Sequence, residues 1–282
     1  MDVLRSVPEL KTWRLTRGRE GRRVSFVPTM GYLHAGHQAL IQRASADGSL
    51  VVVSIFVNPL QFGPNEDFER YPRDEVGDLA RIAEVAPHAA VFLPSVSDMY
   101  PPGFVTRVDV AGVTERLCGR SRPGHFRGVA TVVARLFGLV APDVAYFGQK
   151  DYQQVATLRA MVRDLALPVE VVGVPTVREA DGLALSSRNV YLSPRERVAA
   201  LCLSRGLAAA DALWRSGERD PGTLVQALRA PVEAEPLARL DYAEILDVDS
   251  LQDPQPGRPV VAALAVFFER ARLIDNHVLG TS

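Results

Sequence analysis

The sequence predicts a doubly wound α/β domain with a parallel sheet, followed by a second, smaller α+β domain. In the first half, short apolar runs alternate with helical patterns, and such repeated strand–helix units are joined by right-handed crossovers into a parallel sheet. After about residue 176 the order changes, because helical stretches come first and adjacent β-rich runs follow. We therefore expect domains at residues 1–176 and 177–282, with a hinge at residues 177–189.

Residues 50–57 give the clearest strand of the first domain. Their letters, LVVVSIFV, are mostly β-branched and show no polar alternation, which is typical of a strand buried on both faces. The other strands expected in this domain span residues 24–27, 90–93, 144–147 and 169–174. The helices expected between them span residues 36–46, 74–85, 126–140 and 151–165. In the second domain we expect helices at 194–214 and 222–231, then two or three strands among 242–248, 260–268 and 271–278.

Composition narrows the class of protein. The 282 residues carry 32 basic and 33 acidic side chains, and the net charge of −1 argues against a general nucleic-acid or membrane-surface binder. The longest apolar run, residues 260–268, is shorter than a membrane span, and residues 1–14 lack the apolar stretch of a signal peptide. Cys118 and Cys202 form no CxxC pair, which argues against a zinc ribbon or redox dithiol. We expect a cytoplasmic protein that binds neither nucleic acid nor membranes.

Four common motifs are absent from the sequence: GxGxxG, GxxxxGK[ST], GxSxG and HExxH. Their absence argues against a dinucleotide fingerprint, a P-loop, an α/β-hydrolase elbow and a zincin site. A ligand is still expected outside the carboxyl ends of the parallel strands.

Residues 28–37, PTMGYLHAGH, follow the first long strand and open a helix. Here His34 and His37 can face one anion, beside the free N–H groups of the helix N-terminus. Gly36 lets a ligand approach the backbone closely. Metal binding is an alternative, although the segment offers no obvious third ligand, and two histidines without a functional role are another.

Residues 58–63, NPLQFG, come directly after the strongest strand. The amides of Asn58 and Gln61 can hold a compact polar substrate by directional hydrogen bonds. The alternative is a strand-ending turn, for which Asn-Pro is ordinary.

Residues 147–154, FGQKDYQQ, again lie between a strand and a helix. Lys11 and Lys150 are the two lysines of the chain, and Arg supplies the other 30 basic side chains. Lys150 is therefore notable, because Arg does not replace Lys where a compact charge is needed. A lysine beside a helix N-terminus predicts a phosphate site. The alternative is an ordinary turn with Asp151 as the helix cap.

Residues 186–189, SSRN, follow Asp181 and Gly182 in an irregular segment. Two hydroxyls and a guanidinium can wrap phosphate oxygens, although a solvated interdomain linker has the same composition. Four arginines surround residues 123–125 and form either an anion-facing patch or a solvated face: Arg116, Arg120, Arg122 and Arg127.

Together, in this order and spacing, the motifs resemble the pantoate–β-alanine ligase family over about residues 24–195. They read PTMGYLHAGH, VNPLQF, YPR, RPGHFRGV, FGQKDYQQ and ADGLALSSRN. That family belongs to the nucleotidylyltransferase superfamily. Its HIGH-type signature is similar to residues 34–37, and its KMSKS-type loop is similar to residues 186–188. The resemblance implies a Rossmann-like ATP- and pantoate-binding domain at residues 1–176 and a C-terminal lid at 177–282.

The resemblance also implies an activity. Pantoate and β-alanine would be condensed, with ATP, to pantothenate, AMP and pyrophosphate through a pantoyl adenylate, a reaction of pantothenate and coenzyme A biosynthesis. The expected cofactor is Mg²⁺ that arrives with ATP, and the expected assembly is a homodimer.

Site residues follow from the resemblance by motif. The expected catalytic residues are His34, His37, Lys150, Ser186, Ser187 and Arg188. The same six are expected to bind ATP, together with Met30, Gly148, Asp151, Val177 and Leu185. Pantoate and β-alanine are assigned to Met30, Asn58, Gln61 and Gln154. Arg122 is a candidate near the pyrophosphate end.

Two departures from the family pattern stand out. Leu185 occupies a position where the family commonly has Met, and the similar size predicts little effect. After YPR the family often has adjacent acids associated with magnesium, whereas here Asp78 has Gly77 as its neighbour. No protein metal ligand is therefore assigned.

Three rival functions are disfavoured. Gln61 and Gln154, in their family contexts, argue against a nucleotidylyltransferase that makes no amide. The net charge of −1 argues against a synthetase-like RNA-binding module. The intact His, Lys and Ser-Ser-Arg set argues against an inactive relative.

Overall fold

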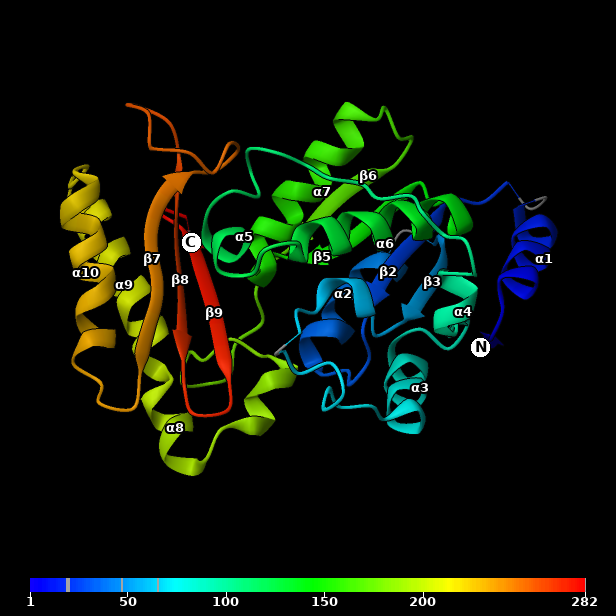
Figure 1. Ribbon diagram of the computed structural model, residues 1–282, viewed down its shortest axis with the longest axis horizontal. Helices are drawn as coiled ribbons and strands as arrows, with labels where there is room; N and C mark the ends of the chain where they lie inside the picture. The colour runs from blue at the N-terminus through cyan, green and yellow to red at the C-terminus, as the bar shows by residue number, and fades with distance from the viewer. Residues whose placement is uncertain (19–20, 47, 65, 282) are drawn as a thin grey trace. The chain divides into compact units, whose positions relative to one another are not determined.

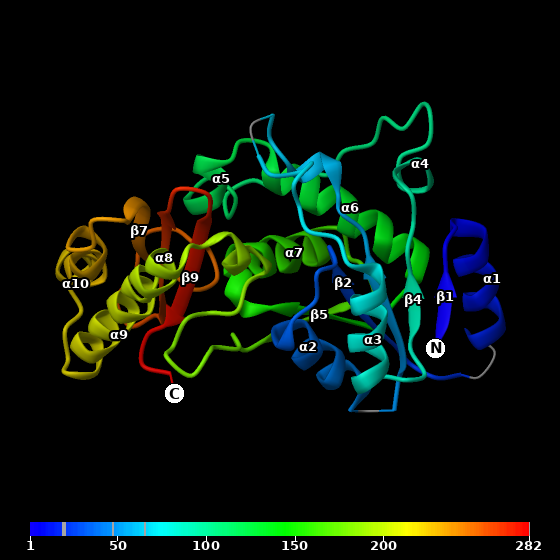
Figure 2. The same cartoon turned by 90° about the horizontal axis from the view of Figure 1, so that it is seen from below.

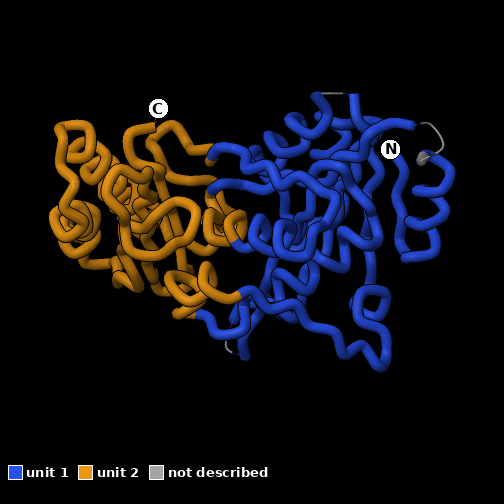
Figure 3. Tube along the Cα trace, turned by 90° about the horizontal axis from the view of Figure 1, so that it is seen from above, with its two compact units in different colours: residues 1–110, 122–149, 157–175 blue, residues 111–121, 150–156, 176–282 orange. Residues whose placement is uncertain are grey.

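The computed structural model describes residues 1–18, 21–46, 48–64 and 66–281. Compactness divides the chain into two units, which Figure 3 colours separately. The first comprises residues 1–110, 122–149 and 157–175, and the second comprises residues 111–121, 150–156 and 176–282. Two short segments that precede residue 176 thus belong to the second unit. The contiguous division at residue 176 stays a prediction.

A six-stranded parallel sheet is the framework of the first unit, which confirms the predicted α/β architecture (Figure 1). Its strands lie in the order β1-β4-β3-β2-β5-β6, and each neighbouring pair is parallel. The strands are β1 Asp2–Leu4, β2 Val24–Thr29, β3 Leu50–Ile55, β4 Ala90–Phe92, β5 Val144–Gly148 and β6 Glu170–Val174. The predicted apolar strand, β3, is buried at its first five positions.

Helices cover both faces of this sheet (Figure 2). On one face lie α2 (Ala35–Ser45) and α3 (Glu75–Val85), which bury Ile41 and Ile82. On the other face lies α6 (His125–Val140), whose Phe137 meets Phe26 edge-on at a centroid distance of 6.4 Å. Burial on both faces explains why the central strands are mostly apolar, although β2 and β3 also bury Ser25 and Ser54.

Several short or weakly patterned elements were not foreseen from the sequence. They are β1, α1 (Val7–Gly18), α4 (Val96–Met99) and α5 (Leu117–Ser121). The strand β1 has three residues, with Asp2 opposite Ala90, and so short a run has no readable periodicity. The helix α7 (Tyr152–Asp164) begins within the second unit and ends within the first.

The second unit is built on an antiparallel sheet in the order β7-β8-β9, which confirms the predicted α+β composition. The strands are β7 Arg239–Asp247, β8 Val260–Phe267 and β9 Arg272–Val278. Two helices, α9 (Leu201–Arg215) and α10 (Pro221–Glu233), share one apolar core with this sheet.

The prediction of a single helix over residues 194–214 is wrong. The structure has α8 (Pro194–Ala199) and then α9, which begins at Leu201. At the junction the N–H of Leu203 donates to the carbonyl of Ala200, three residues back, at 3.2 Å. This tighter hydrogen bond interrupts the regular α-helical pattern.

Hydrogen bonds explain why the two short segments belong to the second unit. Gln153 donates from Nε2 to the carbonyls of Val113 and Arg116, both at 2.8 Å. Asn276 of β9 donates from Nδ2 to the carbonyl of Lys150, also at 2.8 Å. These bonds fix the backbone around Lys150.

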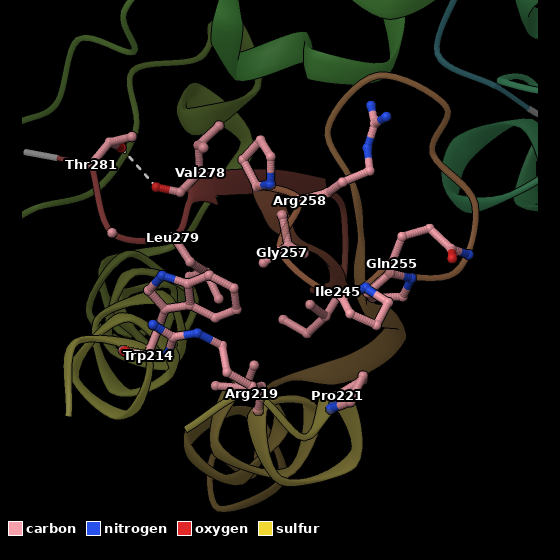
Figure 4. A pocket seen from close by; sticks show the side chains of 16 residues that line it. Trp214, Arg219, Pro221, Ile245, Gln255, Gly257, Arg258, Val278, Leu279 and Thr281 are labelled. Atoms are coloured by element: carbon pink, nitrogen blue, oxygen red, sulfur yellow. Dashed lines mark hydrogen bonds between the residues drawn. The ribbon is translucent and has the colours of Figure 1, made fainter. Parts of the chain in front are cut away.

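The second unit also holds a pocket of about 740 Å³ beside the C-terminal residues of α9 (Figure 4). Trp214 lines it, with the Arg219 guanidinium 3.9 Å from the indole centre. Gly280 lies so close that an added Cβ would approach Trp214 Nε1 at 2.8 Å. Among the described residues, no helix is both long and apolar enough to span a bilayer.

Candidate active site

His34 and His37 cap the start of α2 reciprocally. The N–H of Gly36 donates to Nδ1 of His34 at 3.1 Å, and the N–H of His34 donates to Nδ1 of His37 at 3.3 Å. The ring centroids are 4.1 Å apart. Because each Nδ1 accepts a hydrogen bond, each neutral ring carries its own proton on Nε2. Two Nε2–H donors at a helix N-terminus suit an anion, and the predicted binding of ATP phosphates by this pair stays a prediction.

The loop before this pair has an unusual backbone. Gly31 has φ +82° and Tyr32 has φ +50°, so two consecutive residues lie in the left-handed region. Both carboxylate oxygens of the buried Asp78 accept backbone N–H groups there, from Tyr32 at 2.8 Å and Leu33 at 2.6 Å. Sequence reasoning assigned Asp78 no such contact.

Asn58, Gln61 and Met30 come together in the first unit, whereas Gln154, the fourth residue assigned to pantoate and β-alanine, belongs to the second. Their role toward pantoate stays a prediction. Asn58 donates from Nδ2 to Gln61 Oε1 at 3.0 Å, and Gln61 donates from Nε2 to Met30 Sδ at 3.1 Å. Asn58 is 1% exposed. Its other Nδ2 bond goes to the carbonyl of Gly128 at 3.2 Å. Asn58 therefore holds the side chain of Gln61 in place.

Tyr100 is a member of this cluster that sequence reasoning missed. Its hydroxyl donates to Asn58 Oδ1 at 2.7 Å. Burial raises the pKa of Tyr100 above its ordinary value, so the hydroxyl keeps its proton and remains a donor. No local motif marks Tyr100, because its partner lies 42 residues away.

Arg122 belongs to a network around the backbone of Gln61. Its guanidinium contacts both carboxylate oxygens of Glu66, at 2.7 and 2.6 Å, and donates to the Gln61 carbonyl at 3.3 Å. His125 Nδ1 lies 2.9 Å from the same carbonyl. Burial works to raise the pKa of Glu66, but the hydrogen bond and charge of Arg122 hold that pKa below its ordinary value. The expected role of Arg122 toward pyrophosphate stays a prediction.

Lys150 lies in a single 3₁₀ turn, Gln149–Asp151, that leads into α7. Its side chain is 19% exposed, and Nζ lies 3.8 Å from Asp151 Oδ1. One turn along α7, Gln154 is half-buried. At the end of β5, Gly148 has open space where a Cβ would lie. The predicted strand-to-helix position of this motif is confirmed.

The segment expected to be an irregular hinge is an ordered turn. Arg178 and Ala184 form an antiparallel bridge, and the N–H of Leu185 donates to the carbonyl of Val177 at 3.0 Å. The Arg178 guanidinium also pairs with the buried carboxylate of Asp275, at 2.6 and 2.9 Å. Hinge motion stays a prediction.

Ser186 caps the 3₁₀ helix Ser187–Tyr191 by accepting the Arg188 N–H at 3.2 Å. The predicted ATP-binding residues of the second unit thus lie in two consecutive pieces of structure: Val177 and Leu185 are paired by a backbone hydrogen bond, and Ser186, Ser187 and Arg188 form the start of the 3₁₀ helix. The candidate residues therefore fall into two groups, each described within its own unit. The first unit supplies two imidazoles and the amides of Asn58 and Gln61, and the second supplies Lys150, Asp151, Gln154 and the Ser-Ser-Arg turn.

Comparison with known proteins gives consistent matches over the full length. The Pantoate-beta-alanine ligase family model matches residues 2–278. A pantothenate synthetase of Heliobacterium modesticaldum is 56% identical over 280 residues, and one of Pelotomaculum thermopropionicum is 53% identical over 281; each match covers 99% of both chains.

Solved structures agree. The crystal structure of a pantothenate synthetase from Thermus thermophilus superimposes with a TM-score of 0.91 at 50% identity, covering 98% of this chain and 99% of that one. A pantoate-beta-alanine ligase from Francisella tularensis, complexed with beta-gamma ATP and beta-alanine, gives a TM-score of 0.80 at 32% identity. That match covers 100% of this chain and 99% of the other.

Proposed function

Because this chain belongs to the pantoate–β-alanine ligase family, we propose that it condenses pantoate with β-alanine, using ATP, to give pantothenate, AMP and pyrophosphate. The observation that carries the proposal is the family match across residues 2–278. The motifs that carry the chemistry all lie within that range.

The reaction has two steps. A carboxylate oxygen of pantoate forms a bond to the α-phosphorus of ATP, the bond to the β-phosphate oxygen breaks, and pyrophosphate leaves. The amine of β-alanine then attacks the acyl carbon of pantoyl adenylate, loses a proton, and expels AMP as the amide forms. No protein nucleophile is required, because the substrates supply both nucleophiles. The protein must instead align two anions and offset their repulsion.

His34 and His37 are proposed to donate from Nε2 to phosphate oxygens of ATP. The capping bonds to both Nδ1 atoms support this role, since they fix the tautomer and the ring orientation. Lys150 and Arg188 are proposed to stabilise the negative charge that shifts toward the leaving pyrophosphate, with Ser186 and Ser187 as hydroxyl donors. Preorganised donors of this kind are each worth about 10²–10³ in rate.

Pantoate is proposed to be held by neutral amides, chiefly Gln61 and Gln154, with Asn58 and Met30 beside them. Asn and Gln can bind the pantoate hydroxyls without pairing off the carboxylate that must attack. The bonds from Asn58 to Gln61 and from Gln61 to Met30 support a preorganised pocket wall.

Magnesium is proposed to arrive with ATP and to remain on its phosphates. The Asp78 carboxylate accepts two backbone N–H groups of its own unit, and no protein ligand is proposed for the ion. A homodimer in the cytoplasm is proposed on the family resemblance.

An AMP-release assay in which each substrate is omitted in turn tests the proposal. AMP should form only when ATP, pantoate and β-alanine are all present, and pyrophosphate should need ATP and pantoate. Unchanged AMP release without pantoate would reject the ligase. Pantoate-dependent pyrophosphate release without β-alanine-dependent amide formation would favour a nucleotidylyltransferase that makes no amide.

A further inference from the structure

Asp78 lies in the first turn of α3, and its carboxylate points into the loop that precedes His34. The residue is 1% exposed. One oxygen, Oδ2, accepts the N–H of Tyr32 at 2.8 Å, and the other, Oδ1, accepts the N–H of Leu33 at 2.6 Å. Both donors lie within two residues of His34, so the carboxylate holds the backbone segment that directly precedes the two histidines.

The anchored loop adopts a conformation that needs outside support. Tyr32 has φ +50°, and the left-handed region costs an L-residue with a side chain about 1–2 kcal/mol. Strained residues of this kind persist only where the surrounding structure holds them. The two hydrogen bonds that Asp78 accepts from Tyr32 and Leu33 supply that support.

Gly31 shows how closely the carboxylate and the loop are fitted. A Cβ added to Gly31 would lie 2.9 Å from Asp78 Oδ2 and 3.0 Å from Ile55 Cγ2. Its φ of +82° also disfavours a side chain. The loop can therefore close on Asp78 only with glycine at this position.

Keeping a carboxylate at this position has a cost. Burial raises the pKa of Asp78, and the negative charge of Asp74 adds to that rise, although the two backbone N–H groups and the positive charge of Arg81 oppose it. An apolar side chain would avoid the cost of burying a charge. A buried carboxyl group that holds one strained turn beside a candidate site points to a role in that site.

We propose that Asp78 is a positioning residue for adenylyl transfer, whose carboxylate fixes the left-handed turn at Gly31–Tyr32 and thereby sets the direction of His34 and His37. This inference rests on the proposed function of the two histidines. Asp78 acts through the backbone. Its effect should fall on the rate of the chemical step more than on substrate affinity, since small misalignments of reacting groups are costly.

The test is Asp78→Asn, which keeps the shape but replaces one acceptor by a donor. We expect kcat for pantoate-dependent pyrophosphate release to fall about 10²-fold, while KM for ATP and for pantoate changes by less than about threefold. Circular dichroism and size-exclusion elution should match the parent protein. Asp74→Asn is the matched control, because Asp74 caps the same helix with a side chain 45% exposed and Asn caps equally well. It should keep kcat within about twofold.

A second variant covers the case in which Asp78→Asn does not fold. Gly31→Ala keeps the Asp78 side chain but forces the loop away from its carboxylate, and should give the same selective loss of kcat. The double variant should lose little more than either single one, because both break one contact. Normal kcat in the folded Asp78→Asn protein, or in Gly31→Ala where the first is insoluble, overturns the proposal. Absence of pantoate-dependent pyrophosphate release from the parent protein would instead overturn the proposed function.

Discussion

Gly128 of α6 packs directly against the turn that carries Gln61, and replacing it by Ala should damage pantoate binding selectively. An added Cβ would lie 2.1 Å from the carbonyl oxygen of Leu60 and 2.4 Å from its carbonyl carbon. Ordinary contacts begin at 3.4 Å. The helix and the turn must therefore separate by about 1 Å, because backbone atoms cannot move aside as a flexible side chain can.

The separation has two calculable effects. Overpacking of this kind reduces the free energy of unfolding by about 1–3 kcal/mol, which is a fall in Tm of several degrees for a chain of this size. It also stretches the 3.2 Å bond from Asn58 to the Gly128 carbonyl, which helps orient the amide of Gln61. Misplacement by about 1 Å costs up to about 10²-fold in rate. We expect kcat/KM for pantoate to fall about 10- to 100-fold.

The assay is steady-state AMP release with pantoate varied, alongside ATP titration and thermal unfolding. KM for ATP should stay within about threefold, since His34 and His37 lie on a different loop. Gly138→Ala is the matched control on the same helix, because Gly138 is exposed and nothing lies within 4 Å of its added Cβ. That change should stabilise the helix by about 0.5–1 kcal/mol and leave the kinetics unaltered.

Two outcomes would refute this reasoning. Gly128→Ala with parental pantoate kinetics would show that the position of the turn does not govern the amide of Gln61. An equal loss with respect to ATP and pantoate would show a general loss of folded enzyme instead of a local displacement.

Three further predictions follow from other contacts. Lys150→Ala should lower the rate of adenylate formation by at least about 10²-fold with the fold retained, and Lys150→Arg should also be impaired because a compact charge is needed. Stopped-flow measurement of pyrophosphate release gives both rates. Normal rates would remove the lysine from the mechanism. Arg178→Ala leaves the buried carboxylate of Asp275 without its guanidinium and should lower the free energy of unfolding in urea by about 3 kcal/mol; a change below about 1 kcal/mol would contradict this. Glu66 has a folded-state pKa below its ordinary value of 4.5, so the ionised side chain stabilises the folded protein above that pH, and this contribution is lost as the pH falls through the folded-state pKa. Glu66→Gln should therefore weaken the dependence of Tm on acid pH. Parallel Tm curves for the two proteins would refute the assignment.

Features with a strong local pattern were predictable from the sequence. The run LVVVSIFV became β3, and the motif at residues 147–154 became a strand, a 3₁₀ turn and a helix. The His pair at the start of α2 was predictable because capping depends on near neighbours. Asn58, Gln61 and Met30 lie together because the carboxyl ends of neighbouring parallel strands meet at one edge, whereas Gln154, which was grouped with them, belongs to the second unit.

Features that depend on distant partners were not predictable. Tyr100 reaches Asn58 across 42 residues, and Asp78 reaches Leu33 across 45, so neither contact leaves a local signature. The sequence did not predict the break between α8 and α9 at Ala200, because Ala199 and Ala200 themselves favour a continuous helix. The division of the site residues between the two units also depends on long-range hydrogen bonds, such as that from Asn276 to the carbonyl of Lys150.

The interleaving of the two units along the chain bears on how the protein is made on the ribosome. Cys118 Sγ lies 3.3 Å from the hydroxyl of Tyr242, a partner synthesised 124 residues later. The carbonyl of Lys150 accepts a hydrogen bond from Asn276, which is synthesised 126 residues later. Domains of a growing chain usually fold in order of synthesis, but the second unit here cannot be completed until its last strand has emerged. The backbone that carries Lys150 is therefore among the last parts of the molecule to reach its final structure.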